Sequence, residues 1–285
     1  MKPPTLPSAA NAVRQRFQAL IEGPEAAINL AEAALLIAKE EQEGLDVDAY
    51  LGLLDEFARA AASHLAGCKV PAEQIDALNR FLFVEQGFKG NRDNYYDPAN
   101  SYLNHVLDRR TGIPITLAVV YTEIGQRLGI PVFGVGFPGH FLVKHVGSDD
   151  EILVDPFFGS RLTPEQCEER LRTMYGRTVR LESNMLRPAT PKEILVRILR
   201  NLKNVYLQRE DWIRTLACLD RILLIAPDDP AELRDRGLTY HRLECFGPAL
   251  VDLERYLALV PENEEGVAAV RALMPTLQRA VNQLN

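Results

Sequence analysis

The stretch GFKGNRDNYYDPANSYLNHVLDRRTGIPITL at residues 87–117, together with GVGFPGHFLV at residues 134–143, decides the fold. Residues 87–104 are rich in Gly, Asn, Asp and Tyr and have little helical or strand period, which predicts a long ordered loop. Residues 114–128 are apolar nearly all round. Because they begin with a proline and are followed by Gly129, we expect them to form a buried central helix.

Three short β-rich runs follow the predicted helix: VFGVGF at residues 132–137, FLVKHV at 141–146 and EILVDPF at 151–157. A Pro-Gly pair and the turn sequence at residues 147–150 separate them, which predicts an antiparallel meander. Before the loop, residues 9–83 carry apolar side chains at spacings of three and four, which predicts a helical N-terminal layer. Together these patterns predict an α+β fold.

The C-terminal third of the chain repeats itself. A shift of 34 residues superposes similar residues, which is a strong repeat signal. It places Tyr206 on Tyr240, Trp212 on Phe246, Leu216 on Leu250, Leu219 on Leu253, and Pro227 on Pro261. Through Gly237, Tyr240, Ala249 and Pro261 the segment resembles the tetratricopeptide repeat, which implies paired helices closed by a last helix. We therefore expect two domains, residues 1–188 and residues 189–285.

Composition argues against several classes of protein. The chain has 285 residues and a formal net charge of −7, so we expect no nucleic-acid partner. No stretch of about 18 apolar residues runs without charge, so we expect no membrane span. The four cysteines form no CxxC pair, which indicates reduced thiols and a cytoplasmic location.

His140 and Asp155 are the pair that points to chemistry. His140 begins one predicted strand and Asp155 ends the next, so the two can meet across an antiparallel pair, where a carboxylate orients an imidazole. Period two places His140 and His145 on opposite faces of the strand, which disfavours a shared metal site. We predict no metal and no cofactor.

The order of these elements is similar to the transglutaminase-like, papain-like core of cysteine hydrolases. More closely, the motifs quoted above resemble the bacterial Sir-B-type family of transglutaminase-like proteins with C-terminal tetratricopeptide repeats. The resemblance runs from about Leu30 to Pro261. It implies that His140 and Asp155 are the histidine and aspartate of a triad. The position of the cysteine nucleophile, however, reads Pro114.

Two functions therefore stay open. The first is a non-catalytic interaction or regulatory protein, a pseudoenzyme in which His140 and Asp155 serve a retained scaffold or a binding site. The second is a hydrolase or amide-group transferase that uses the same pair with a water or with Thr116. A threonine needs a positioned base to act as a nucleophile and ordinarily bonds helix backbone groups instead.

Polar loop residues before the central helix are candidates for a ligand site. Amides and phenols there can bind a peptide or a small polar ligand without transforming it, or they can simply close turns. The candidates are Tyr95, Tyr96, Asn100, Ser101 and Asn104.

The first helix of each repeat is expected to line a groove that binds a protein partner. Its arginines predict a basic surface that suits an acidic or carboxylate-terminated peptide. The alternative is a solvated helix face packed against the core domain. The candidate residues are Arg197, Arg200, Asn204, Arg234, His241 and Arg242.

Overall fold

A computed structural model describes residues 8–147 and 151–284 of the chain. The chain divides into two compact units, one of residues 12–198 and one formed mainly by residues 199–284. The α+β fold predicted from the sequence is confirmed, with small sheets confined to the first unit. Within the described ranges no helix combines the length and the apolar surface that a membrane span needs.

A helical layer opens the first unit, as predicted. Side-chain caps begin two of its helices: Asn29 accepts a hydrogen bond from Glu32 N–H at 3.0 Å, and Asp46 accepts from Ala49 N–H at 3.1 Å. These bonds satisfy backbone donors that a helix start leaves open. The elements are α1 (Ser8–Glu22), α2 (Leu30–Glu41), α3 (Val47–Leu65), α4 (Pro71–Asn79) and the π-helical turn η2 (Arg80–Glu85).

The predicted central helix is α6 (Pro114–Arg127), and its residues 114–125 are all buried. It ends as expected at Gly129, which takes a φ of 73°, while Ile130 N–H returns to the Gly125 carbonyl at 2.9 Å. Gly125 is required for packing because a Cβ there would overlap the Val132 side chain. The sheet therefore sits directly on this helix.

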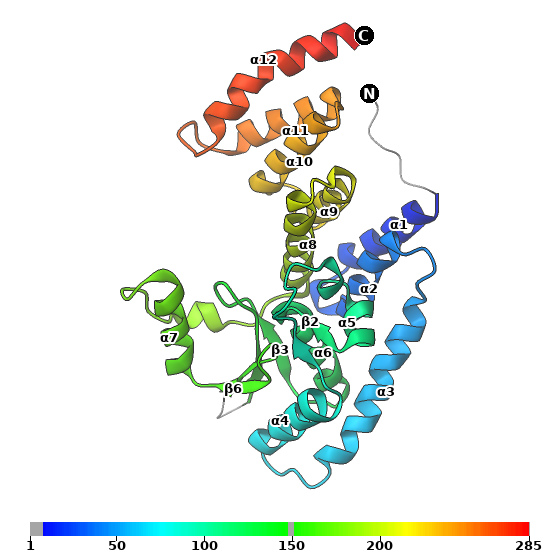
Figure 1. Ribbon diagram of the computed structural model, residues 1–285, viewed down its shortest axis with the longest axis vertical. Coiled ribbons are helices and arrows are strands. Elements are labelled where there is room, and N and C mark those ends of the chain that lie inside the picture. The colour runs from blue at the N-terminus through cyan, green and yellow to red at the C-terminus, as the bar shows by residue number, and fades with distance from the viewer. Residues whose placement is uncertain (1–7, 148–150, 285) are drawn as a thin grey trace. The chain divides into compact units, whose positions relative to one another are not determined.

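The sheet is an antiparallel meander in the order β3-β4-β5-β6. Helix α6 lies beside β3 (Figure 1) and contacts β3 and β4. Helix α7 packs its Cys167 and Leu171 with Val135, Leu142 and Leu153 in an apolar cluster. The elements are β3 (Val132–Val135), β4 (Leu142–Val146), β5 (Glu151–Asp155), β6 (Ser160–Leu162) and α7 (Pro164–Tyr175).

Two details of the sheet differ from the sequence prediction, and a third cannot be compared with it. His140 lies before β4 rather than on it, because the Pro-Gly turn extends through His140, whose N–H donates to Phe137 O at 3.0 Å. The strand β6 had not been predicted. The predicted turn at residues 147–150 lies, for residues 148–150, outside the described residues.

The loop before α6 is held by a short parallel pair, β1 (Lys89–Gly90) with β2 (Thr111–Gly112). Between them lie the 3-10 turn η3 (Pro98–Asn100) and the helix α5 (Leu103–Arg109), so the segment is ordered, as predicted. Its last residues form α5 rather than loop. The pairing holds the loop beside the start of α6.

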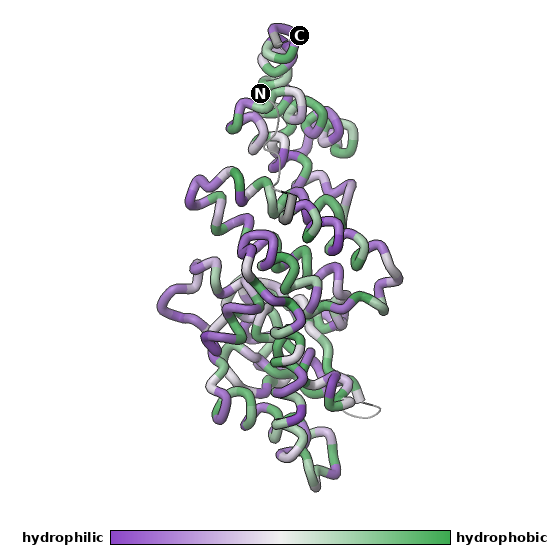
Figure 2. The backbone as a smooth tube through the Cα atoms, turned by 90° about the vertical axis from the view of Figure 1, so that its right-hand side faces the viewer, coloured by the Kyte–Doolittle hydropathy of each residue, from purple (hydrophilic) through white to green (hydrophobic). Residues whose placement is uncertain are grey.

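Paired helices form the C-terminal part, and α9 and α11 begin at the superposed residues Trp212 and Phe246. A capping box begins α8, since Glu193 N–H donates to Thr190 Oγ1 at 3.3 Å and Thr190 N–H donates to Glu193. Green and purple alternate along these helices, which are amphipathic (Figure 2). The helices are α8 (Pro191–Gln208), α9 (Trp212–Ile225), α10 (Pro230–Arg242), α11 (Phe246–Leu259) and α12 (Val267–Leu284).

Candidate functional site

The expected meeting of His140 and Asp155 is confirmed. His140 Nε2 lies 3.1 Å from both carboxylate oxygens of Asp155. Asp155 ends β5 and its side chain is fully buried, whereas 15% of the His140 side chain is exposed. The aspartate is therefore a fixed internal anchor, and the imidazole is the member of the pair that reaches the surface.

Asp155 is surrounded by hydrogen-bond donors. Its Oδ1 accepts from the N–H groups of Phe157 at 3.0 Å and Phe158 at 3.3 Å, and its Oδ2 forms an ion pair with Arg170. Burial by itself raises the pKa of Asp155, but the hydrogen bonds and charges of His140 and Arg170 together outweigh burial and hold that pKa below its ordinary value. Because an ionised carboxylate only accepts hydrogen bonds, His140 Nε2 carries the hydrogen that faces Asp155.

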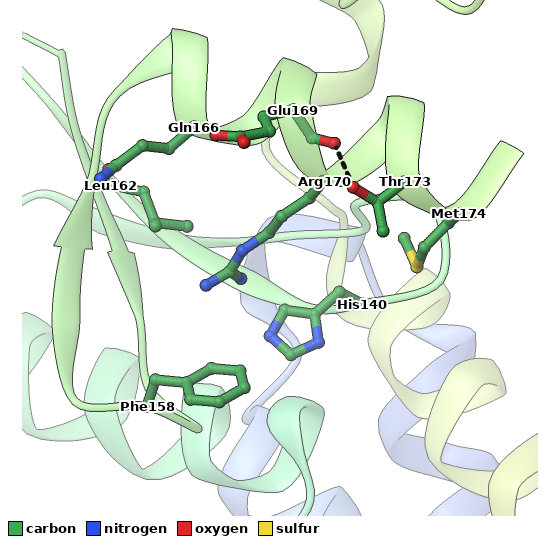
Figure 3. Close-up of a pocket in the computed structure, with 8 residues that line it drawn as sticks. All are labelled: His140, Phe158, Leu162, Gln166, Glu169, Arg170, Thr173 and Met174. Atoms are coloured by element: carbon green, nitrogen blue, oxygen red, sulfur yellow. Dashed lines mark hydrogen bonds between the residues drawn. The ribbon is translucent and has the colours of Figure 1, made fainter. Parts of the chain in front are cut away.

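The His140 ring borders a pocket of about 480 Å³ between the sheet and α7. In Figure 3 the Arg170 guanidinium descends from α7 toward His140, with Phe158 below them. The side chains that line the pocket combine an apolar floor with a few polar groups, which is the usual make-up of a ligand site. They are His140, Phe158, Leu162, Gln166, Glu169, Arg170, Thr173 and Met174.

Arg170 and Phe158 are site residues that the sequence analysis missed. The Phe158 ring is 49% exposed, and the guanidinium carbons of Arg170 and Arg92 lie 5.2 Å and 4.7 Å from its centroid. The only sequence signal is the position of Phe158 three residues after Asp155. Nothing in the sequence of α7 indicates which of its arginines faces the sheet.

No thiol lies in this pocket. Pro114 occupies the first position of α6, and Cys167, the cysteine of α7, is buried in the apolar cluster under that helix. Burial raises the pKa of the Cys167 thiol, which disfavours the reactive thiolate. The described residues also contain no group of three His, Cys, Asp or Glu side chains placed to hold a metal ion.

The Thr116 hydroxyl serves the start of α6. It lies 2.7 Å from the Asn100 carbonyl and 3.1 Å from the Ile113 carbonyl, both acceptors for its hydrogen, and it accepts from Ile113 N–H at 3.2 Å. Only 1% of Thr116 is exposed. A hydroxyl bonded in this way is not available as a nucleophile without breaking the cap, so the structure does not support that role.

The five loop candidates do not form one open ligand site. Asn100, Ser101 and Asn104 are buried, and only Tyr95 and Tyr96 are exposed. The Asn100 amide donates to the carbonyls of Asn94 at 2.8 Å and Tyr95 at 3.1 Å, so it closes the loop. Because these three side chains are buried, only Tyr95 and Tyr96 of the predicted ligand site face solvent, and ligand binding there stays a prediction. Tyr95 packs edge-on against Phe157, which itself contacts His140.

Two of the four arginines predicted to make the repeat groove basic form ion pairs within the chain. Arg200 donates to Asp229 at 2.6 Å and to Glu232 at 2.8 Å, while Arg234 donates to Asp235 at 3.0 Å. These carboxylates lie about thirty residues after Arg200, one repeat later. The Arg200 guanidinium is therefore engaged within the chain, and the binding of an acidic partner by this surface stays a prediction.

Asn204 is exposed on α8, and the His241 and Arg242 side chains border a second pocket of about 410 Å³ beside Trp212. The Arg242 guanidinium carbon lies 5.9 Å from the centroid of the Trp212 ring. The Arg197 side chain is half-buried, and it belongs to the first unit. Three of the six predicted partner residues therefore remain as candidates within the repeats: Asn204, His241 and Arg242. Among the described residues none of the three forms an ion pair within the chain.

Glu232 pairs with two cations of this surface, so Glu232→Gln should destabilise the folded protein. Its carboxylate is 2% exposed and accepts from Arg200 and from the buried Lys203 at 2.8 Å each. We expect the substitution to lower the free energy of unfolding by about 1.5 kcal/mol, because two charge-assisted hydrogen bonds lose their ionised acceptor. Urea unfolding followed by Trp212 fluorescence measures this, and the exposed Glu254→Gln on α11 should change it by less than about 0.5 kcal/mol. Equal effects would contradict the assignment.

A family model described as the transglutaminase-like superfamily matches residues 48–200, more than half of the chain. The chain belongs to the transglutaminase-like superfamily. A second model, described as tetratricopeptide repeat, matches residues 202–275. Both resemblances inferred from the sequence are therefore confirmed.

Curated bacterial proteins resemble this transglutaminase-like protein along most of its length. A UPF0162 protein of Xylella fastidiosa (strain Temecula1) is 45% identical over 238 residues, which cover 82% of this chain and 85% of the relative. A UPF0162 protein of Pseudomonas aeruginosa is 35% identical over 236 residues, with 83% and 86% covered. Protein SirB1 of Salmonella typhimurium is 30% identical over 192 residues, with 67% and 71% covered. These relatives confirm the Sir-B-type family. No solved structure matches the chain significantly.

Proposed function

We propose that this transglutaminase-like protein is a non-catalytic, cytosolic interaction protein. Its core pocket beside His140 binds a peptide-like segment, and its tetratricopeptide repeats dock a protein partner. The observation that carries the proposal is the site of the expected nucleophile. That position holds Pro114, and the Thr116 hydroxyl two residues later is buried and bonded to backbone carbonyls. Four free cysteines, three of them buried, support a reducing cytosol.

The pocket supports binding better than turnover. Its floor is apolar, and the Phe158 and Met174 side chains are 49% and 47% exposed, so an inserted apolar side chain would cover surface that now faces water. Asp155 and Arg170 hold each other and the imidazole in place. A rigid, partly apolar pocket of this size suits one or two side chains of a peptide.

A hydrolase or amide-group transferase is the second candidate, and one observation favours it. Asp155 orients His140 through Nε2, which leaves Nδ1 able to accept a proton, as a general base must. In that reaction a water takes the place of the thiol, and His140 removes its proton. Activity that requires His140 would therefore favour this candidate.

Selective retention of peptides tests the proposal. The full chain is incubated with a digest of cytosolic proteins, and peptides that stay bound after gel filtration are identified by mass. We expect a retained set whose masses are unchanged, and we expect Thr173→Arg to abolish retention because Thr173 lines the pocket. Glu254→Arg, an exposed change on α11, should leave that set intact. Retention that survives Thr173→Arg would overturn the pocket assignment.

No buried cysteine should react in the native protein. Cys68 is half-buried, whereas the other three thiols are buried, so iodoacetamide should modify Cys68 first and the others only on unfolding. Intact-mass measurements over time would show one fast addition, and Cys68→Ser should remove it without changing peptide retention. Rapid alkylation of Cys167 would contradict this expectation.

A further inference from the structure

Phe158, which lines the His140 pocket, carries on its ring a positive charge that the chain does not use internally. Arg92 is exposed and stacks on Phe158 with its guanidinium carbon 4.7 Å from the ring centroid. It forms no ion pair with any residue of the described ranges. Its position over an exposed aromatic ring keeps the guanidinium beside the pocket instead of free in solvent. An arginine held in this way is poised to meet an anionic group on a ligand.

Arg170 adds donors beside the same ring, with its guanidinium carbon 5.2 Å from the Phe158 centroid. Its Nη1 is bonded to Asp155, while the rest of the guanidinium faces the pocket beside His140 (Figure 3). Asp155 itself is fully buried behind His140 and already accepts several hydrogen bonds. The buried carboxylate therefore fixes Arg170 without presenting a negative surface to a ligand.

Glu169 is the acidic side chain that lines the pocket. In Figure 3 its carboxylate is directed along α7 toward Gln166 and not toward the Arg170 guanidinium. Two guanidinium groups thus lie at Phe158, and the Glu169 carboxylate is directed away from the Arg170 guanidinium. Charge complementarity around Phe158 therefore favours an anionic group on the ligand.

We propose that the ligand of this pocket is a peptide segment in which an acidic residue stands next to a large apolar one. The apolar side chain enters between Phe158 and Met174, and the carboxylate meets Arg92 and the open edge of Arg170. This inference rests on the proposed function, since it names the chemistry of the segment that the pocket binds. In this inference Arg92 and Phe158 select the ligand.

Four labelled hexapeptides test the inference with the full chain. They share glycine flanks and differ in the central pair, which is Phe-Glu, Phe-Gln, Phe-Lys or Ala-Glu. Fluorescence polarisation measures their dissociation constants at low and at high salt. We expect Phe-Glu to bind tightest and Phe-Lys weakest of the three phenylalanine peptides, with the difference shrinking as salt rises.

Substitutions of Arg92 and Phe158 separate the contribution of charge to binding from that of the aromatic ring. Arg92→Gln should weaken Phe-Glu by about threefold to fivefold, as expected for a partly exposed ion pair, and leave Phe-Gln unchanged. Phe158→Ala should weaken both peptides. Arg59→Gln, an exposed arginine on α3, is the matched control and should change neither.

The outcomes distinguish this inference from the proposed function. Equal binding of Phe-Glu and Phe-Gln, with both weakened by Phe158→Ala, would overturn the acidic preference and leave peptide binding in place. A preference for Phe-Glu that Arg92→Gln does not reduce would also overturn it. If no peptide binds at any concentration reached, the proposed function fails as well.

Discussion

Asp155→Ala is expected to destabilise the unit of residues 12–198 by about 3–5 kcal/mol, because it removes one partner of a buried ion pair. The carboxylate is fully buried, and its loss leaves the Arg170 guanidinium and the Phe157 and Phe158 N–H groups without their acceptor. Hydrogen exchange of β4 and β5 measures the change in opening free energy. Asp155→Asn keeps the size of the side chain and should cost about half as much.

Asp93→Ala is the control for this substitution, since Asp93 is exposed in the loop before α5. We expect it to change stability by less than about 0.5 kcal/mol. His140→Ala should cost about 1 kcal/mol, since it removes one hydrogen bond from a partly exposed ring. If Asp155→Ala were as mild as Asp93→Ala, the carboxylate would not anchor the pocket.

The same carboxylate predicts a dependence of stability on acid pH. The pKa of Asp155 is held below its ordinary value of 3.8, so the folded state binds its proton more weakly than the unfolded state does. The stabilisation is therefore fully present above the ordinary pKa and is lost as pH falls through the lower, folded-state pKa. The stability difference between the natural chain and Asp155→Asn should be constant near neutral pH and shrink below 3.8. A difference that grows in acid would contradict this sign.

Gly237→Val is expected to disrupt the packing of α10 on α11, at a cost of about 3 kcal/mol. A Cβ at Gly237 would lie 2.6 Å from Leu253 Cγ and 2.8 Å from Leu253 Cδ2, and Leu253 is fully buried. The repeat therefore needs glycine here for close approach of two helices and not for its backbone freedom. Urea unfolding followed by Trp212 fluorescence measures the loss.

Gly247 on α11 provides the matched control. A Cβ there meets no atom within 4 Å, so Gly247→Val should be neutral or slightly stabilising through helix propensity. If the two valine substitutions behaved alike, close approach at Gly237 would not explain the glycine of the repeat. If Gly237→Val were neutral, the helix pair would pack differently from the structure.

Local signals in the sequence predicted the fold well, because they act over a few residues. The proline start of α6 at Pro114 and its glycine end at Gly129 are both present. The meeting of His140 and Asp155 was also predictable, since consecutive antiparallel strands bring their ends together. Each of these features depends on chain neighbours or on one strand pairing.

Contacts made by tertiary packing were not predictable in the same way. Arg170 reaches Asp155 only because α7 folds back over the sheet, and no periodicity in α7 marks that arginine as special. From the sequence Asn100 is interpreted as a ligand-binding amide. In the structure its amide donates to a loop carbonyl, that of Asn94. From the sequence Arg200 is interpreted as a free charge. In the structure it donates to Glu232, which lies one helix pair later. A single sequence contains these residues and their partners, but it does not show which of them are in contact.

The central claim is that the pocket binds without transforming what it binds, and peptide turnover measures this most directly. The full chain and His140→Ala are incubated with glutamine- and asparagine-containing peptides in water enriched in oxygen-18, and masses are followed over time. The account predicts that the peptides keep their masses with both proteins, with no cleavage, deamidation or crosslink above the protein-free rate. Product that incorporates the heavy oxygen with the natural chain and disappears with His140→Ala would contradict it and establish a hydrolase.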